Sequence, residues 1–137
     1  MQNWLYNDKE ITDDSIPEGS EGFVYKIIHE PTGKYYIGKK SLWAKRTLPP
    51  LKGKKRKRKV IKESDWKKYH SSNDWIKEQV KGGNSDDFKR EIIQFCPSKK
   101  SLTYYELRWQ MYYDVLADDN CLNENLLGKF YRKDLIL

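Results

Sequence analysis

Two short strand-like segments near the N-terminus constrain the fold more than any other part of the chain. Residues 22–28 (GFVYKII) and 35–40 (YYIGKK) are rich in β-branched and aromatic residues, which are typical of strands. The linker between them contains Pro31 and Gly33, and these residue types mark turns. The pattern therefore predicts an antiparallel hairpin with a tyrosine in each strand.

Alternation along the hairpin assigns its side chains to faces. Phe23, Tyr25 and Ile27 are expected on one face of the first strand. In the second strand, Gly38 follows Tyr36 by two residues and leaves room for a close approach to the backbone. Strand propensity alone accounts for a tyrosine in each segment. A functional role for the two tyrosines must therefore rest on residues further along the chain.

Composition predicts one ordered domain. A chain of 137 residues can bury a single core, and its five tryptophans and ten tyrosines argue against disorder. No hydrophobic stretch approaches the length of a membrane span, and the acidic N-terminus lacks a signal-peptide core. We expect a soluble, cytoplasmic protein without a membrane partner. Cys96 and Cys121 form no CxxC motif, which favours reduced, packed thiols over a disulfide.

The formal net charge of +7 is concentrated in the middle of the chain. Residues 23–69 hold sixteen basic and three acidic residues, whereas residues 1–22 hold one lysine and six acidic residues. The densest block is expected to be an extended, mobile loop that polyanions order; it contains Lys52, Lys54, Lys55, Arg56, Lys57, Arg58 and Lys59. A nuclear-localisation signal or a solvated loop would have the same composition.

The position of the basic block favours nucleic acid as the partner. It follows directly on the tyrosine hairpin and on Lys39, Lys40, Lys45 and Arg46. Positive charge is therefore expected close to the tyrosine pair, where it would attract phosphates.

Helices are expected after the hairpin. Ser41 is a suitable N-cap for a short helix that includes Arg46 and ends before the Pro-Pro pair at 49–50. Beyond the basic block, Ser64 is a suitable cap for a helix at 65–69.

The second half of the chain predicts two helices around a strand. Ser72 is expected to cap the first helix, which stops at a Gly-Gly pair. A third strand at 88–95 has an apolar centre, which suggests that it lies between neighbouring strands and under a helix. The second helix should begin at Ser98 or Ser101 and end near residue 117.

This last helix carries a carboxylate on its apolar face. Glu106 lies four residues after Leu102 and three before Trp109, so it shares their face. A buried carboxylate without a partner is unstable. Glu106 therefore either forms an ion pair with a nearby Arg or Lys or belongs to a site.

These features resemble the GIY-YIG nuclease family, whose name records two motifs on the first two strands of its domain. Here the motifs read FVY at 23–25 and YIG at 36–38. The second motif is intact. The first keeps only its tyrosine, because Gly22 lies one place too early to be the motif glycine.

The resemblance extends to residues later in the chain. The family has an arginine on the helix after the second strand, a metal-binding glutamate followed three residues on by an aromatic, and a closing asparagine. Arg46, Glu106 and Asn123 suit these roles, with Asn125 as the competing choice for the asparagine. The resemblance thus implies one Mg²⁺ (or Mn²⁺) ion on Glu106 and a catalytic set of Tyr25, Tyr36, Arg46, Glu106 and Asn123.

The implied chemistry is phosphodiester hydrolysis. Tyr25 would act as general base or position the water, and Tyr36 would hydrogen-bond at the same phosphate. A phenol has an ordinary pKa of about 10, so a phenolate would need nearby cations, for which Lys39 and Lys40 are candidates. Arg46 would clamp the phosphate.

The chain also departs from the family pattern. Many relatives carry a histidine one turn after the arginine, where this chain has Pro50. His70 is a candidate substitute, although a histidine at a helix junction is more often structural. The basic block is an insertion that bears on substrate binding. The segment around Ser71 and Ser72 resembles the Ser-Ser segment of phage-type members.

The expected architecture is an α+β domain with a small, three-stranded, mainly antiparallel sheet flanked by helices. Residues 1–20 would be a loose acidic leader, residues 21–128 the nuclease domain with a basic loop at about 47–63, and residues 129–137 a C-terminal tail. Gly38, Lys39, Lys40 and His70 would support the site.

The expected function is a metal-dependent DNA endonuclease of phage or mobile-element type. It would act on double-stranded DNA as a monomer or homodimer. A protein that binds nucleic acid without cutting it is one alternative, and a structure-specific or RNA-directed nuclease is another. Zinc-finger and His-Asn-His nuclease sites are excluded because the chain has too few ligands.

Overall fold

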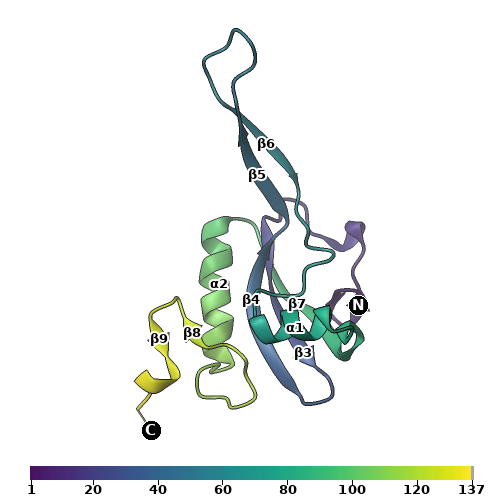
Figure 1. Cartoon of the computed structure of the whole chain (residues 1–137), viewed down its shortest axis with the longest axis vertical. Coiled ribbons are helices and arrows are strands. Elements are labelled where there is room, and N and C mark those ends of the chain that lie inside the picture. Colours follow the sequence, from purple (N-terminus) through teal and green to yellow (C-terminus); the bar gives the residue numbers. More distant parts are fainter. Residues whose placement is uncertain (137) are drawn as a thin grey trace.

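The computed structural model describes residues 1–136 and shows an α+β domain (Figure 1). Its helices and strands are, in chain order, β1 (Leu5–Tyr6), β2 (Lys9–Glu10), β3 (Gly22–His29), β4 (Lys34–Ser41), β5 (Trp43–Leu48), β6 (Arg58–Glu63), α1 (Asp74–Lys81), β7 (Phe88–Cys96), α2 (Lys99–Tyr112), β8 (Asn125–Leu126) and β9 (Phe130–Tyr131). The main sheet has the order β2-β1-β7-β3-β4. The α+β class is confirmed, but the sheet has five strands instead of the expected three.

The predicted tyrosine hairpin is present as β3 and β4. The strands pair antiparallel, with Tyr25 opposite Gly38 and Ile27 opposite Tyr36. β7 pairs antiparallel with the other edge of β3, and β1 pairs with β7 in parallel. β7 therefore lies between two strands, as its apolar centre predicted.

The N-terminal segment, expected to be loose, is part of the fold. Trp4 is 1% exposed, and its indole Nε1 donates a 2.8 Å hydrogen bond to the carbonyl of Trp66. The guanidinium carbon of Arg90 lies 4.7 Å from the centre of the Trp4 ring. Burial of Trp4 holds residues 1–20 against the body despite their polar composition. The tryptophan buries a large apolar area, and its N–H finds a hydrogen-bond partner.

Side chains alternate across the sheet and form a core on each face. Tyr25 and Ile27 pack toward Ile76 of α1. On the opposite face, Val24 packs in the cluster that contains Leu102 of α2. Figure 1 shows α1 and α2 on opposite sides of β3 and β4. The predicted alternation along the first strand is therefore confirmed.

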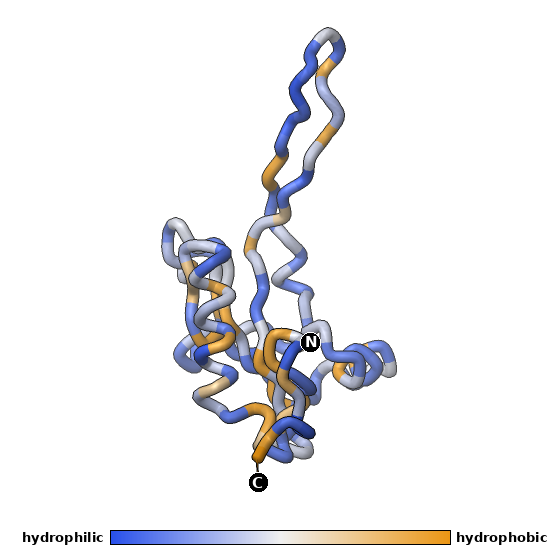
Figure 2. Tube along the Cα trace, turned by 90° about the vertical axis from the view of Figure 1, so that its left-hand side faces the viewer, coloured by the Kyte–Doolittle hydropathy of each residue, from blue (hydrophilic) through white to orange (hydrophobic). Residues whose placement is uncertain are grey.

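The helix expected at residues 41–48 is wrong, because β5 and β6 form a two-stranded ribbon that projects from the body (Figure 1). Trp43, Thr47, Val60 and Ile61 are β-branched or aromatic, and such side chains favour cross-strand pairs. The basic block is consequently only in part a loop. Its first residues lie at the tip of the ribbon, and its last residues belong to β6. Figure 2 shows that the ribbon is mostly hydrophilic, whereas hydrophobic segments gather in the body.

The helix expected at 65–69 is also wrong, because this segment forms only a turn in which the Lys68 amide bonds to the Asp65 carbonyl at 3.0 Å. The cap of α1 is Asn73 instead of Ser72. The Asn73 side chain accepts a 3.0 Å hydrogen bond from the Ile76 amide. Ser72 is thereby left available for another contact.

α2 begins after its cap Ser98, as expected, but ends at Tyr112. Asp114 has a φ of 51°, a left-handed conformation that an α-helix cannot continue through. Cys96 and Cys121 are buried and free. No helix of residues 1–136 has the length and hydrophobicity needed to cross a membrane.

The C-terminal segment is fastened to the body. Phe130 and Tyr131 form β9, which pairs with β8. The guanidinium of Arg132 donates hydrogen bonds to the carbonyls of Leu116 at 2.7 Å and Cys121 at 2.6 Å. The domain therefore continues past the expected boundary at residue 128.

We predict that Trp4→Ala lowers the free energy of unfolding by about 3–5 kcal/mol, the usual cost of truncating a buried tryptophan. Chemical denaturation followed by circular dichroism measures the change. Trp43→Ala is the matched control and should cost much less, because Trp43 is 43% exposed. Equal losses in the two variants would contradict the structural role of the N-terminal segment.

Candidate active site

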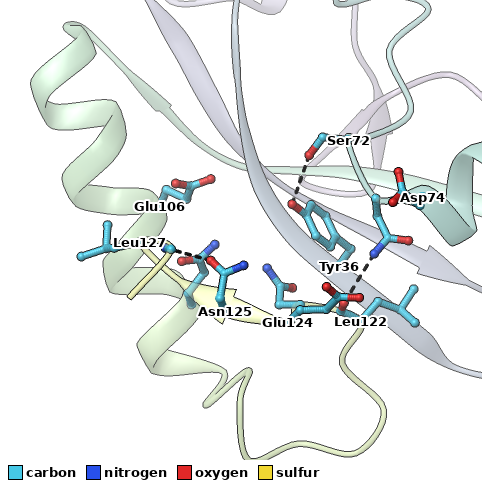
Figure 3. Close-up of a pocket in the computed structure, with 12 residues that line it drawn as sticks. Tyr36, Ser72, Asp74, Glu106, Leu122, Glu124, Asn125 and Leu127 are labelled. Atoms are coloured by element: carbon cyan, nitrogen blue, oxygen red, sulfur yellow. Dashed lines mark hydrogen bonds between the residues drawn. The ribbon is translucent and has the colours of Figure 1, made fainter. Parts of the chain in front are cut away.

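A polar pocket opens at the outer edge of β4. It has a volume of about 350 Å³, and its walls come from β4, α2, the start of α1 and the segment after Cys121 (Figure 3). Its polar side chains are Tyr36, Ser72, Asn73, Asp74, Glu106, Gln110, Asn123, Glu124 and Asn125. The fold thus brings together three of the predicted site residues, Tyr36, Glu106 and Asn123, from distant parts of the chain.

Tyr36 forms the wall that faces α2. Its ring is half-buried, and its hydroxyl lies 3.3 Å from the Ser72 hydroxyl. Burial raises the pKa of Tyr36, and the hydrogen bond with Ser72 opposes this rise. Figure 3 shows Tyr36 and Ser72 side by side at the pocket wall. Tyr36 therefore presents a neutral hydroxyl to the pocket.

A strained turn presents Ser72. Ser71 is 2% exposed and has a φ of 101°, which is unusual for a residue with a side chain. Its hydroxyl accepts a 2.8 Å hydrogen bond from the Asn73 amide, and Asn73 caps α1. Such conformations persist where the surrounding structure holds them. The turn fixes Ser72 beside Tyr36.

Tyr25 lies beneath the pocket and does not line it. It is 1% exposed, and its ring centre is 6.2 Å from that of Tyr36 and 5.8 Å from that of Tyr69. Burial, followed by the nearby phenols of Tyr69 and Tyr36, raises the pKa of Tyr25 well above its ordinary value. Burial therefore favours the neutral phenol of Tyr25 in the free protein, and a phenolate favoured by Lys39 and Lys40 stays a prediction.

Gly38 is required for the two tyrosines to pack over β4. A Cβ atom at this position would lie 2.5 Å from the Tyr25 hydroxyl oxygen and 2.9 Å from a ring carbon of Tyr36. These distances are too short for any side chain to be accommodated without displacing the rings. The YIG glycine thus makes space for the aromatic pair.

Glu106 reaches the pocket from α2. Its side chain is half-buried, and no ion pair involves it within residues 1–136. Burial raises the pKa of Glu106, while the charge and the backbone amide of Lys39 oppose this rise. Figure 3 shows its carboxylate directed from the helix toward Tyr36 and Ser72. The ion-pair explanation for this carboxylate therefore finds no support.

Lys39 and Lys40 point to different partners. The ammonium of Lys39 donates a 2.8 Å hydrogen bond to the Thr103 hydroxyl on α2. The ammonium of Lys40 pairs with the Asp65 carboxylate at 2.6 Å and lies 4.4 Å from the centre of the Tyr69 ring. These two lysines directly follow the YIG motif and, as neighbours in a strand, point to opposite faces of the sheet.

Asn123 completes the edge of β4. Its Oδ1 accepts a 2.9 Å hydrogen bond from the Ile37 amide, and its Nδ2 donates a 2.8 Å bond to the Ile37 carbonyl. The Cys121 thiol donates to the same Oδ1 at 3.1 Å. Asn123 is 4% exposed, and both atoms of its side-chain amide bond to the backbone of Ile37. Its contacts are structural, and Asn125 is the more accessible amide.

Several predicted residues lie outside the pocket. Arg46 is exposed on β5, opposite Val60, because the expected helix is a strand. His70 is half-buried after the turn at 65–69 and does not line the pocket. Lys45 and the basic block lie on the exposed ribbon. Among the residues that line the pocket there is accordingly no lysine, arginine or histidine.

Other pocket residues were not predicted from the sequence. Gln110 lies one helical turn after Glu106, a spacing that would have placed it on the same face; its Nε2 donates a 3.2 Å bond to the Ile37 carbonyl. Asp74 and Glu124 add two carboxylates. No sequence pattern distinguishes these two from ordinary surface acids.

Comparison with protein families decides the assignment. The family model described as "Putative endonuclease segE, GIY-YIG domain" matches residues 4–134. The chain belongs to the GIY-YIG nuclease family. No curated protein and no solved structure matches it.

The GIY-YIG match gives the pocket its general chemistry. This family is one of nucleases, so the substrate is a nucleic acid. The match includes the N-terminal segment and the whole β5–β6 ribbon. Both features therefore belong to the GIY-YIG domain of this chain, and the family resemblance drawn from Tyr25 and the YIG motif is confirmed.

We predict that Asn123→Ala lowers the free energy of unfolding by about 1–3 kcal/mol, because it leaves the buried amide of Ile37 without its side-chain acceptor. Thermal or chemical denaturation measures the loss. Asn125→Ala, in the same segment, is the control and should have a smaller effect. A larger loss from Asn125→Ala would reverse the structural assignment of the two amides.

Proposed function

We propose that this protein is a divalent-metal-dependent endonuclease that hydrolyses phosphodiester bonds in DNA. The observation that carries the proposal is the half-buried Glu106 carboxylate, which has no ion pair within residues 1–136 and faces Tyr36 across a polar pocket. A carboxylate in this setting is unfavourable unless a cation joins it.

Glu106 is the residue that would hold Mg²⁺ or Mn²⁺. Within residues 1–136 no group of three or more His, Cys, Asp or Glu side chains is arranged around a metal position. Mg²⁺ suits such a site because it commonly uses one or two carboxylates and takes its other ligands from water and phosphate. When bound, the ion would supply charge that stabilises the phosphate in the transition state.

Tyr36 and Ser72 would orient the reacting groups. The Tyr36 hydroxyl is neutral and directed into the pocket, so it would hydrogen-bond the attacking water or a phosphate oxygen. Tyr25 is fully buried beneath it, which favours a positioning role over that of a general base. Its ring supports Tyr36 and Tyr69 from below.

Cations from outside the pocket would neutralise the phosphate. Lys39 and Lys40 directly follow the YIG motif, and each bonds to a group that DNA phosphates could replace. Arg46 would contact the DNA from the ribbon, away from the reacting phosphate. One pocket cuts one strand, so double-strand cleavage would require two copies of the protein or two binding events.

We predict that Glu106 makes the metal-free protein less stable as the pH rises. Burial raises the pKa of Glu106 in the folded state, whereas an unfolded glutamate titrates near about 4.3. The folded state therefore holds this proton more tightly, and stability falls as the pH rises through the raised pKa. In EDTA, Glu106→Gln should become more stable relative to wild type as the pH rises from the unfolded pKa of glutamate, about 4.3, through the raised pKa of the folded state. The two proteins should differ least below about pH 4.

Adding Mg²⁺ at neutral pH should reverse the difference in stability between Glu106→Gln and the wild type. The ion should raise the melting temperature of the wild type, because a ligand that binds only the folded state stabilises it. Glu106→Gln should show little response. Glu124→Gln, which alters another carboxylate of the same pocket, should respond like wild type. Equal Mg²⁺ stabilisation of Glu106→Gln and wild type would exclude Glu106 as the ligand.

We predict that Glu106→Ala abolishes Mg²⁺-dependent nicking of supercoiled plasmid. Tyr36→Phe should slow nicking by about 10²–10⁴-fold, the usual contribution of a group that handles a proton or orients water. Tyr25→Phe should cost less, because its hydroxyl does not reach the pocket. Gel assays of plasmid cleavage measure all three rates.

The matched control is Glu124→Ala, which should keep most of the activity. Full activity of Glu106→Ala would contradict the mechanism in which Glu106 binds the metal ion. A wild-type protein that binds DNA in Mg²⁺ but never cuts it would support the binding-only alternative.

A further inference from the structure

The β5–β6 ribbon is separate from the main sheet and strongly basic. Within the described residues 1–136, its two strands pair only with each other, and the ribbon projects beyond the body (Figures 1 and 2). Residues 43–63 contain ten basic residues and one acidic residue. An isolated two-stranded hairpin is at best marginally stable in water, and its like charges repel one another. Such an element is best explained by a polyanionic partner.

The root of the ribbon is firmly held. Leu42 is 2% exposed in the core, its amide bonds to the Glu21 carbonyl at 2.9 Å, and its carbonyl accepts a 2.8 Å bond from the Ser64 amide. The Trp43 indole donates a 3.0 Å bond to the Ser20 carbonyl. The ribbon is therefore a projection with a fixed starting direction.

The strand register gives the ribbon two unlike faces. Directly paired residues share a face, so the pairing assigns Ala44, Arg46, Leu48, Arg58, Val60 and Lys62 to one face, here called the arginine face. This face has three cations and no acid. The opposite face carries Lys45, Lys59 and Glu63, and its Lys45 lies 3.7 Å from the Glu21 carboxylate of the body.

We propose that this ribbon enters the major groove of double-stranded DNA, with the arginine face toward the base edges and the tip lysines against phosphates. The proposal rests on the proposed function for the identity of the substrate. The B-DNA major groove is about 12 Å wide and admits a two-stranded ribbon, whose strands lie about 4.8 Å apart. Arginine is the side chain that most often contacts guanine there.

Other nucleic acids fit the ribbon less well. The major groove of an A-form RNA duplex is too deep and narrow for side chains to read. Single strands are usually held by stacking on aromatic rings, and the only aromatic residue in the ribbon is Trp43, at its root. The arrangement therefore favours duplex DNA.

Binding measurements in EDTA test the face assignment without requiring cleavage. Arg46→Gln/Arg58→Gln changes the arginine face, and Lys45→Gln/Lys59→Gln removes the same charge from the opposite face. By fluorescence anisotropy on a short DNA duplex, the first double variant should bind about tenfold or more weakly than wild type, and the second only a fewfold more weakly. Unchanged melting temperatures would show that both remain folded. Equal losses from the two variants would overturn the face assignment.

Chemical footprinting tests the groove. Dimethyl sulfate methylates guanine N7, which lies in the major groove. The wild type should protect N7 positions that Arg46→Gln/Arg58→Gln leaves exposed. Competition by the minor-groove ligand netropsin, or equally tight binding of a duplex RNA, would contradict the proposal.

The outcomes separate the ribbon proposal from the proposed function. Plasmid cleavage without N7 protection would count against the ribbon alone. N7 protection without Mg²⁺-dependent cleavage would count against the nuclease mechanism alone.

Discussion

The outward-facing backbone of β4 is the constraint on which the rest of the site depends. β4 is the last strand of the main sheet, and unpaired edge groups need partners or cover. The segment after α2 supplies them, because Tyr35 bonds to the backbone of Asn120 and Leu122 and Ile37 bonds to the Asn123 side chain. The same segment lines the pocket, so covering the edge also places this wall of the pocket beside Tyr36. The same contacts that stabilise the sheet therefore assemble the site.

Charge is divided between two regions of the domain. The pocket contains the carboxylates of Asp74, Glu106 and Glu124 and no basic side chain among its lining residues, whereas residues 43–63 contain ten basic residues. An acidic pocket repels a phosphate unless cations accompany it. The ribbon would supply most of the affinity for the polyanion, and the pocket would acquire its substrate only together with a divalent ion. DNA binding would thus take place mainly on the basic ribbon, and hydrolysis in the acidic pocket.

The sequence predicted local features better than their surroundings. The β3–β4 hairpin follows from alternation and turn residues, and the apolar stripe of α2 correctly placed Glu106 toward the interior. Residues 43–48 were predicted as helix because a capping serine precedes them, but cross-strand partners in residues 58–63 decide the conformation. The burial of Trp4 likewise depends on Trp66 and Arg90. The pocket residue Ser72 was assigned to a cap, because nothing in the local pattern shows that Asn73 takes that role.

Continuity along one strand links the ribbon to the reacting groups. β4 carries Tyr36 and Gly38 and ends at Ser41, and the ribbon begins two residues later, at Trp43. Buried Leu42 lies between them, so the junction has little freedom to bend. A duplex held by the ribbon would therefore meet the Tyr36 pocket at a distance set by the strand itself. Sequence preference, if it comes from the arginine face, would then fix the position of the cut relative to the bases that are read, because no flexible linker separates reading from cutting.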